Sequence, residues 1–599
     1  MQKVKAAARS GGVDTAYNKN PRPCETPSLQ HNITTMAEEV CMAPDGDPMV
    51  TFGFMANWTS LLKLLAAAST PLILMLVIPM IVKRIGRSFG SYLKRKSAGR
   101  KAQILELVEA AEKEFQKEGG ERRDSDEWES VEAYAVGTAK NGEKADKEWD
   151  GVVGFFHPFC NAGGGGERVL WAAIRATQKR WPNAKCIVYT GDHDVGKHDI
   201  LARVQTRFNI QLHPPTIHFL YLTTRSWVLA SSWPRFTLLG QSIGSLVLAW
   251  DAFSLLTPDI FVDTMGYAFA LGFTKLLFPD IPTGAYVHYP TISTDMLESL
   301  DPDSENGDQG VNAGAGTGVR GLAKKAYWNL FAFFYTQVGV SIDIVMTNSN
   351  WTLDHIQALW GQDRRENEKI RAISVYPPVA VEELEKEVEV SEASEAKREP
   401  ILLYIAQFRP EKNHQLILTA FAEFMATKTP ATKGTKLVLI GSVRDDGDSK
   451  RVYELRLLAN ELQIRDNVEF HLDASWPEIL DWLRRASVGV NGMWNEHFGI
   501  GVVEYQAAGL ISVVHDSGGP KRDIVVTVDR LPTGFRGITA TQFAEGFEKA
   551  LSLSVPDKLA MRHRARYSAK RFTEEQFSKG WISGMEILVR LRQKQAKSP

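Results

Sequence analysis

Two glutamates eight residues apart, Glu496 and Glu504, lie where a predicted strand turns into a predicted helix. The apolar run 486–490 is typical of a buried parallel strand, residues 502–508 have helical character, and residues 511–514 resume a strand. This pattern predicts a βαβ unit with two carboxylates at the turn. Carboxylates accept hydrogen bonds from sugar hydroxyls, so the pair suits a sugar nucleotide.

Glycines in the same turn allow a ligand to approach the backbone closely, and the first N–H groups of a helix favour an anion such as a diphosphate. The residues expected at this donor-binding turn are Phe498, Gly499, Ile500 and Gly501. A simpler reading also exists. Glu496 is then a solvated loop residue, and Glu504, which we expect in the first turn, is a favourable charge near a helix start.

Two cations follow another predicted strand. Arg409 and Lys412 come after the apolar run 401–405 and precede an amphipathic helix over 415–424. The carboxyl ends of parallel strands are where open α/β sheets bind ligands. Two cations there can neutralise a diphosphate and the charge that grows on it as a sugar departs.

These residues carry a resemblance to known enzymes. Arg409 with Lys412, the glutamate pair and the loop 516–520 resemble the donor domain of retaining GT-B glycosyltransferases over about residues 400–570. Three stretches of the N-terminal half, 152–171, 188–192 and 284–293, resemble the eukaryotic α-1,2-mannosyltransferases of lipid-linked oligosaccharide assembly. The resemblance implies an α/β chain with two Rossmann-like domains facing across a cleft.

The same resemblance implies the substrates and the roles of the residues. GDP-mannose is the expected donor and a dolichol-diphosphate-linked oligosaccharide the acceptor, with retention, no cofactor and no obligatory metal. The donor diphosphate is expected against Arg409 and Lys412, its ribose at Glu504 and the mannose at Glu496. The fourth and fifth mannoses are the expected additions, and other mannosyltransferases of the pathway are possible partners.

His288 follows the apolar run 285–287 and is expected at a strand end facing the cleft. A lone histidine is more often structural, but the resemblance implies that it contacts the transferred sugar. The glycine run Gly163, Gly164, Gly165 and Gly166 is expected to connect a strand over 152–156 to a helix starting near Glu167. Such runs are common in doubly wound domains, and this one is not a clean dinucleotide-binding motif.

Two rival functions remain open at this stage. One is a soluble-type glucosyltransferase that uses UDP- or ADP-glucose, and the other is a catalytically inactive membrane scaffold. The Asp192-His-Asp194 run is like a metal-binding motif of another glycosyltransferase fold, but we expect it to form a turn.

Composition limits the alternatives. The chain has 599 residues, a net charge of −1 and four cysteines without metal-like spacing. This gives no support for a nucleic-acid partner, a disulfide scaffold or a zinc fold.

A membrane segment is expected near the N-terminus. Residues 64–82 carry no charge, and a cluster of lysines and arginines follows from Lys83. The stretch is long enough to span a bilayer and lies too far from Met1 for a cleaved signal peptide. The positive-inside tendency places the catalytic body in the cytosol, at the endoplasmic reticulum membrane. Asn32 is then a candidate lumenal glycosylation site.

The predicted domains are a lumenal tail (1–60), a transmembrane anchor (61–83), a charged cytosolic linker (84–150), an acceptor domain (151–378), a donor domain (379–555) and C-terminal helices that pack back on the first domain (556–599).

Two further stretches, 236–250 and 324–334, combine apolar residues with tryptophans or cations. We expect interfacial membrane contact there, although such stretches are more often buried core. The Gly- and Asp-rich stretch 301–321 is expected to be an insertion without chemistry.

Overall fold

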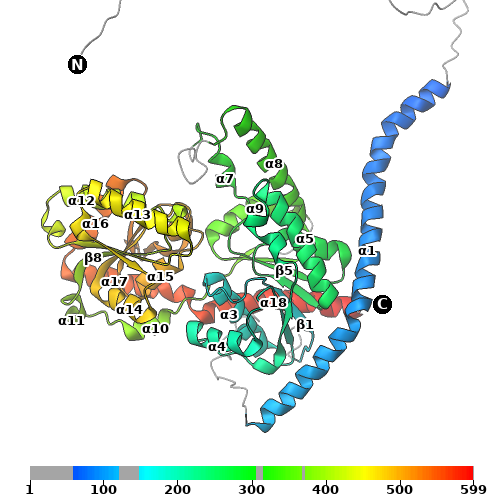
Figure 1. Cartoon of the computed structure of the whole chain (residues 1–599), viewed down its shortest axis with the longest axis horizontal. Helices are drawn as coiled ribbons and strands as arrows, with labels where there is room; N and C mark the ends of the chain where they lie inside the picture. The colour runs from blue at the N-terminus through cyan, green and yellow to red at the C-terminus, as the bar shows by residue number, and fades with distance from the viewer. Residues whose placement is uncertain (1–57, 120–147, 305–314, 367–371, 598–599) are drawn as a thin grey trace, which may run out of the picture. The chain divides into compact units, whose positions relative to one another are not determined.

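The structure is a computed structural model that describes residues 58–119, 148–304, 315–366 and 372–597, with side chains omitted for 58–76 and 362–366 (Figure 1). The chain divides into two units, Met1–Leu76 and Val77–Pro599. The contacts below all lie within the second unit. Residues 1–57 of the predicted lumenal tail, including Asn32, and the side chains of anchor residues 61–76 lie outside the described residues.

The first domain is built on a seven-stranded parallel sheet. Its order is β3-β2-β1-β4-β5-β6-β7, so the strand order reverses between β1 and β4. This is the doubly wound arrangement, in which ligands bind beyond the carboxyl ends of the strands. The strands are β1 (Val152–Phe156), β2 (Lys185–Thr190), β3 (Ile217–Tyr221), β4 (Ile260–Asp263), β5 (Thr283–Val287), β6 (Ile344–Thr347) and β7 (Ile373–Ser374).

Helices cover both faces of this sheet, which explains why its strands are continuous apolar runs rather than alternating patterns. Phe156 and Phe261 point into one core, while Phe155 and Trp171 point into the other, and all four are fully buried. The helices are α3 (Gly165–Arg180), α4 (Lys197–Phe208), α5 (Thr237–Leu255), α6 (Ala268–Leu277), α7 (Thr294–Glu298), α8 (Gly318–Val340) and α9 (Asn350–Glu366).

The second domain repeats the plan with a six-stranded parallel sheet of order β10-β9-β8-β11-β12-β15. The strands are β8 (Glu399–Ile405), β9 (Lys436–Gly441), β10 (Val468–Leu472), β11 (Ala486–Asn491), β12 (Ile511–His515) and β15 (Gly534–Gly537), beside a small antiparallel pair, β13 (Thr527–Val528) and β14 (Leu531–Pro532).

Helices again cover both faces of the second sheet, one core containing Leu403 and Val502 and the other Leu402 and Phe421. The helices are α10 (Val381–Glu387), α11 (Glu392–Glu395), α12 (His414–Ala426), α13 (Asp446–Glu461), α14 (Trp476–Arg485), α15 (Ile500–Ala507), α16 (Ala540–Ser552), α17 (Val555–Ala569) and α18 (Glu574–Lys597). The two Rossmann-like domains of a GT-B fold are therefore present.

The C-terminal helices divide between the domains. Helix α17 stays on the second domain, where Arg562 bonds Glu395 at 2.8 Å and the Gly509 carbonyl at 2.6 Å. Only α18 packs back on the first domain, with Trp581 buried there and its indole N–H donating to the Thr177 hydroxyl at 3.0 Å (Figure 1). The expectation that all of 556–599 packs on the first domain is therefore corrected for α17.

The segment after the predicted anchor is not a simple tether. Helix α1 (Trp58–Lys117) is continuous through it. Leu93, Ile104 and Val108 are buried in the core of the first domain, and Lys101 pairs with Asp259 at 3.0 Å. The apolar residues recur on one helical face between the charged residues. The high charge content of this segment led to the prediction of a tether and did not reveal that face.

Candidate functional site

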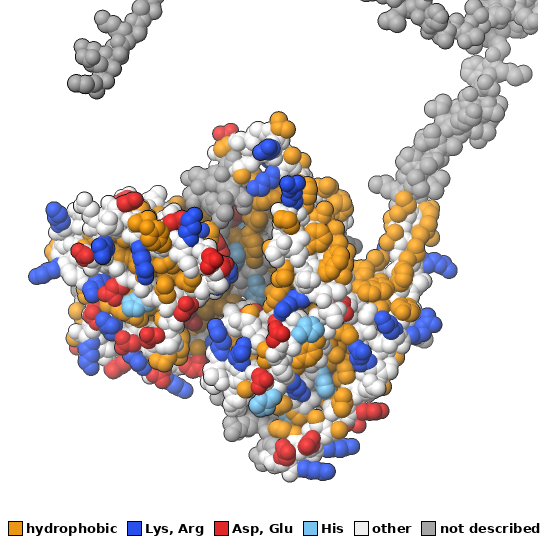
Figure 2. All heavy atoms as spheres, viewed as in Figure 1, with side chains coloured by type: hydrophobic (Ala, Val, Ile, Leu, Met, Phe, Trp, Pro, Cys, Tyr) orange, Lys and Arg blue, Asp and Glu red, His pale blue; other side chains and the backbone are white. Residues whose placement is uncertain are grey.

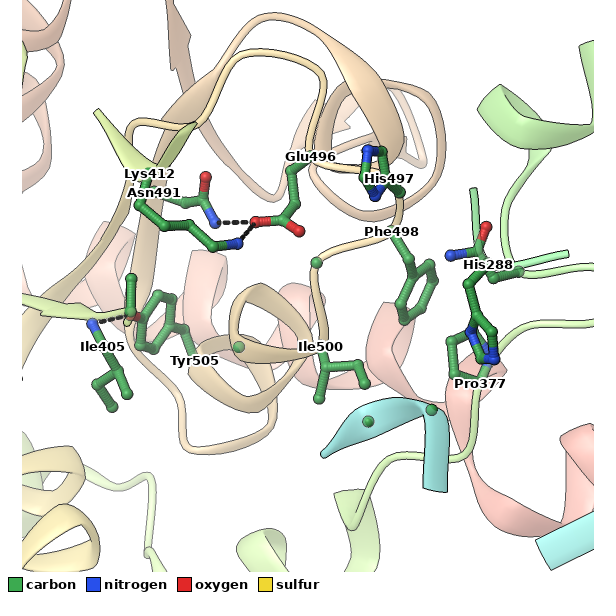
Figure 3. Close-up of a pocket in the computed structure, with 16 residues that line it drawn as sticks. His288, Pro377, Ile405, Lys412, Asn491, Glu496, His497, Phe498, Ile500 and Tyr505 are labelled. Carbon is green, nitrogen blue, oxygen red and sulfur yellow. Dashed lines mark hydrogen bonds and ion pairs between the residues drawn. The ribbon is translucent and has the colours of Figure 1, made fainter. Parts of the chain in front are cut away.

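A cavity of about 270 Å³ lies between the two domains, at the carboxyl edges of both sheets (Figure 3). Residues from the first domain that line it are Gly165, Gly166, His288, Asn348 and Pro377. Residues from the second domain are Ile405, Ala406, Lys412, Asn491, Glu496, His497, Phe498, Gly499, Ile500, Gly501 and Tyr505. The whole predicted donor-binding turn, 498–501, thus faces this cavity.

The turn is formed as the βαβ pattern predicts. β11 leads through the loop 492–499 into α15, and β12 follows. Gly499 has φ of +107°, a conformation that side chains with a Cβ rarely adopt. Because α15 begins at Ile500, Glu504 lies in its second turn and not in the first, which corrects the sequence expectation.

Lys412 and Glu496 form an ion pair inside the cavity. The Lys412 Nζ lies 2.5 Å from the Glu496 Oε2, and the Asn491 amide donates to the same oxygen at 3.3 Å (Figure 3). Burial raises the pKa of Glu496, but the charge and hydrogen bond of Lys412 lower it by more, so the net pKa is below its usual value. The carboxylate is therefore ionised at neutral pH.

The loop after β12 fixes the backbone around Glu496. The Gly519 N–H donates to the Glu496 carbonyl at 2.7 Å, and the Ser517 hydroxyl accepts from the Asn495 N–H at 2.7 Å. Gly518 has φ of +64°, and a Cβ there would collide with the Glu496 backbone. The loop 516–520 thus fixes the backbone that carries the Glu496 side chain.

His288 lies at the carboxyl end of β5 and faces the cavity (Figure 3). Its Nε2 is 3.1 Å from the Thr264 carbonyl oxygen, which can only accept, so the proton is on Nε2 and Nδ1 is an acceptor. Burial lowers the pKa of His288 to about 4, and nearby His157 acts in the same direction. The ring is neutral at neutral pH.

His497 joins the two domains beside the cavity. Its ring stacks on Tyr289 with centroids 3.9 Å apart, and its carbonyl accepts from the Ser349 hydroxyl at 2.5 Å. The neighbouring Asn495 amide donates to Asp295 at 2.6 Å. Burial lowers the pKa of His497 to about 4. The loop that carries Glu496 is therefore held by both domains.

The glycine run shapes the opposite wall. The helix α3 begins at Gly165, two residues before the expected Glu167, and only Gly165 and Gly166 line the cavity. Gly163 turns the chain with φ of +79°, and the Gly164 N–H bonds the Glu167 carboxylate. A Cβ on Gly165 would come within 2.7 Å of the Ile500 side chain, so glycine permits the close approach of α3 and α15.

Arg409 and Glu504 do not line this cavity. The Arg409 guanidinium lies 3.5 Å from Glu411 instead. Glu504 is partly buried, and burial raises its pKa to about 7 against the lowering effect of Arg168. Of the four charged residues expected together, the structure brings Lys412 and Glu496 into contact and adds His288 to the same cavity.

Sequence reasoning missed several cavity residues. Asn491 ends β11 and bonds Glu496, and the Tyr505 hydroxyl accepts from the Ile405 N–H at 2.7 Å. His497 could have been predicted as a cavity residue, because it directly follows Glu496 in the sequence. The contribution of Tyr505 depends on the pairing of β8 with β11, for which the local sequence has no signal.

The Asp192-His-Asp194 run forms the expected turn, in which Asp192 pairs with Arg225. Within the part of the chain that the structure describes, no group of three His, Cys, Asp or Glu side chains is arranged to hold a metal ion.

Comparison with known proteins gives consistent results for both domains. Residues 150–360 match the family described as ALG11 mannosyltransferase N-terminus, and residues 385–572 match glycosyl transferases group 1. The chain is 66% identical over 534 residues to a Neurospora crassa protein named GDP-Man:Man(3)GlcNAc(2)-PP-Dol alpha-1,2-mannosyltransferase, covering 87% of this chain and 95% of that one. Proteins of the same name from Mus musculus and Homo sapiens are 44% and 43% identical over 461 residues, covering 76% of this chain and 89% of theirs.

Solved structures support the fold. The N-terminal domain of a Candida albicans trehalose-6-phosphate phosphatase superposes with a TM-score of 0.54 at 12% identity, covering 75% of this chain and 98% of that one. A trehalose 6-phosphate synthase from Burkholderia multivorans gives the same score and identity, covering 75% and 100%. At this identity the likeness concerns the arrangement of the two domains alone.

Proposed function

This chain belongs to the family of GDP-Man:Man(3)GlcNAc(2)-PP-Dol alpha-1,2-mannosyltransferases, and on that premise we propose how its cavity carries out the reaction. The enzyme transfers mannose from GDP-mannose in α-1,2 linkage to a dolichol-diphosphate-linked oligosaccharide. The observation that supports the assignment to this cavity is the partly buried Lys412–Glu496 pair beside the start of α15. A fixed cation and a fixed carboxylate are the groups that a diphosphate and a sugar require.

The donor diphosphate is placed at the N–H groups of residues 499–501, where the positive end of α15 favours negative charge. Lys412 reaches the same space and neutralises charge that grows on the phosphate as the sugar departs. Glu496 accepts hydrogen bonds from mannose hydroxyls, and Glu504 accepts them from ribose. Arg409 also binds the diphosphate. To do so, its guanidinium leaves the Glu411 carboxylate, which lies 3.5 Å away.

The transfer retains the anomeric configuration. The bond between the mannose C1 and the β-phosphate oxygen breaks, the acceptor 2-hydroxyl bonds C1 on the same face, and its proton passes to the departing GDP. His288, neutral and with Nδ1 free to accept, contacts a hydroxyl of the transferred mannose from the first domain. Lys412 and the helix start take the role that a metal has in other transferases.

Membrane association fits an acceptor whose diphosphate stays at the headgroup level. Among the helices whose side chains are described along their whole length, α5 alone is long and apolar enough to cross a bilayer, and 39% of its apolar stretch is buried. Its exposed apolar side chains include Leu239 and Ile243, Phe236 directly before it is also exposed, and those of α8 include Phe333 and Phe334. Figure 2 shows hydrophobic side chains gathered over α5 and along the described upper part of α1.

The Tyr327 ring contacts Phe236 with centroids 5.4 Å apart, and Trp250 contacts Phe89 at 5.7 Å, so α8, α5 and α1 are linked laterally. We assign this surface to the endoplasmic reticulum membrane, with α1 as the single-pass anchor and the catalytic body on the cytosolic side. The orientation rests on the lysines and arginines that follow residue 82.

The experiment uses the full-length enzyme in lipid vesicles with labelled GDP-mannose and a lipid-linked Man(3)GlcNAc(2) acceptor. We expect two successive additions, both removed by a mannosidase specific for α-1,2 linkages. UDP-glucose and ADP-glucose serve as competitors and should neither be consumed nor inhibit. Transfer of glucose, or the absence of any transfer, would refute the proposal in favour of the glucosyltransferase or the inactive scaffold.

A further inference from the structure

Two helix starts meet across the cleft, and each carries an ionisable side chain one turn further along. Gly165 of α3 lies against Ile500 of α15, since a Cβ on it would come within 2.7 Å of that side chain. Arg168 follows Gly165 by three residues and Glu504 follows Ile500 by four, the spacings that keep residues on one helical face. The contact therefore turns Arg168 of the first domain towards Glu504 of the second.

Among the described residues, neither side chain has a hydrogen-bond or ion-pair partner of its own. The Nε of Arg168 is buried, and within the described residues the guanidinium makes no hydrogen bond or ion pair. The Glu504 carboxyl likewise makes no side-chain hydrogen bond to any described residue, although it is partly buried. A buried guanidinium nitrogen without a partner, such as the Arg168 Nε, is costly, and such groups persist where a ligand completes them.

The electrostatics agree with this placement. Burial lowers the pKa of Arg168, and the strongest opposing influence is Glu504, followed by Glu383 and Glu382 of α10. Burial raises the pKa of Glu504 to about 7, and Arg168 is the charge that opposes this rise. The two groups are thus each other's principal electrostatic neighbours.

Other ionisable groups on elements packed against α15 are engaged elsewhere. On α17, Arg562 bonds Glu395 and Arg566 bonds the Ala507 carbonyl. In the segment Pro520–Ile524, Lys521 pairs with Asp516, Arg522 with Asp354, and Asp523 bonds Asn350. Glu382 and Glu383 of α10 and the buried phenol of Tyr505 also interact electrostatically with this pair, but none of the three supplies positive charge, and Lys386 of α10 is exposed.

We propose that Arg168 is a positioning residue for donor binding: from across the cleft, its charge keeps Glu504 in the carboxylate form that accepts the ribose hydroxyls of the donor. The inference rests on the proposed function, because it takes the ribose to lie at Glu504. It also makes donor affinity depend on domain closure, since the cation and the carboxylate belong to different domains.

The consequence for pH follows directly. A protonated carboxyl accepts fewer hydrogen bonds than a carboxylate, so donor affinity falls as pH drops through the pKa of Glu504. Replacing Arg168 by an uncharged residue removes the charge that lowers this pKa, so the pKa rises further. At a pH near neutrality, a smaller fraction of the protein then carries the carboxylate.

The test measures GDP-mannose binding to the full-length enzyme by calorimetry between pH 5.5 and 9. We expect Arg168→Gln to move the midpoint of the acid loss of affinity upwards by about one pH unit, which is about a tenfold weaker affinity below the midpoint. Arg168→Lys keeps the charge and should give a midpoint between the two. Arg203→Gln removes an exposed arginine from α4 of the same domain and should match the unmodified protein.

A second measurement needs no donor. Above pH 7 an ionised Glu504 without its cation destabilises the fold, so Arg168→Gln should lower the midpoint of thermal unfolding more at pH 8 than at pH 5.5. In a Glu504→Gln background this pH-dependent difference should vanish. Unchanged pH profiles in both measurements overturn the inference while leaving the mannosyltransferase assignment intact. Failure of the unmodified protein to bind GDP-mannose would instead remove the proposed function.

Discussion

Lys412 is the residue whose charge the proposed chemistry needs most. Lys412→Met removes the cation at the departing diphosphate, and we expect turnover to fall about 100- to 1,000-fold, as when one fixed transition-state donor is lost. Initial rates with lipid-linked acceptor at saturating GDP-mannose measure this. Lys433→Met, an exposed lysine of the same domain, is the matched control and should retain full turnover.

A loss of activity in Lys412→Met has a second possible source, because Glu496 is left buried without its cation. The double variant Lys412→Met/Glu496→Gln removes that charge as well. It should unfold at a higher temperature than Lys412→Met and stay inactive. Recovery of turnover in the double variant would show that Lys412 only neutralises Glu496.

The raised pKa of Glu504 predicts how the stability of the fold changes with pH. Burial raises its folded-state pKa from the ordinary 4.5 to about 7, so the folded protein binds this proton more tightly than the unfolded chain does. The associated stability is fully present below pH 4.5 and is lost as pH rises through 7. Glu504→Gln should therefore raise the unfolding temperature relative to the unmodified protein at pH 8 and gain less or nothing at pH 5. A gain of equal size at both values would show that the carboxyl is not shifted.

At the scale of the element, the two glycines at the start of α15 have different roles: Gly499 allows the backbone conformation of the turn, and Gly501 leaves room for the donor. Gly499 has φ of +107°, so Gly499→Ala should destabilise the fold by about 1–2 kcal/mol. Gly501 lines the cavity with ordinary φ, and a Cβ there would meet no protein atom closer than the Ile405 carbonyl at 3.9 Å. Gly501→Ala should fold normally and weaken GDP-mannose binding. Thermal unfolding and calorimetry on the two variants give this contrast, and normal donor binding by Gly501→Ala would place the diphosphate elsewhere.

Elements with strong periodicity were predictable, and contacts between distant elements were not. The strands at 152, 401, 486 and 511 and the helix after Lys412 match the sequence expectation closely, because buried parallel strands are continuous apolar runs. The start of α15 differs by two residues, since Gly499 turns the chain earlier than helical propensity indicates. α1 was expected to tether, but its apolar face at Leu93, Ile104 and Val108 is buried against the first domain.

The same holds for the site: residues in local motifs were predictable, and contacts between distant residues were not. Glu496, Lys412 and the 498–501 turn were found from local motifs, and the structure gathers them at one cavity. The electrostatic influence of Arg168 on Glu504 joins positions 336 residues apart, and nothing within either helix signals the other. Arg409 has the right residue type and position in the sequence, yet its side chain turns to Glu411.

At the scale of the whole molecule, the two domains contribute different groups to the site. The second domain supplies Lys412, Glu496 and the α15 start, while the first supplies His288 and the exposed apolar helices. The contacts of Asn495 with Asp295 and of Asn350 with Asp523 keep the cleft closed around the cavity. Under the proposed function, these contacts hold a donor on the second domain next to a lipid-linked acceptor on the first.

The apolar surface of α8 makes the last prediction. Phe333 and Phe334 are 57% and 50% exposed, and burying each in the bilayer interface contributes up to about 1.5–3 kcal/mol. In vesicles, Phe333→Ser/Phe334→Ser should raise the KM for a long-chain lipid-linked acceptor about tenfold, with the KM for GDP-mannose unchanged. A water-soluble short-chain acceptor should show no such increase, because it does not reside in the membrane.

The matched control for this surface is Tyr453→Ser/Leu457→Ser on α13, whose side chains are 63% and 45% exposed on the second domain. It removes a similar apolar area away from the proposed membrane face, so the KM for both acceptors should stay the same. Helix α1, the proposed anchor, is unchanged in every variant, so the comparison isolates how the body lies on the bilayer. Equal increases in KM for both acceptors in the α8 variant would assign the two phenylalanines to protein stability or acceptor-sugar contact rather than to the membrane.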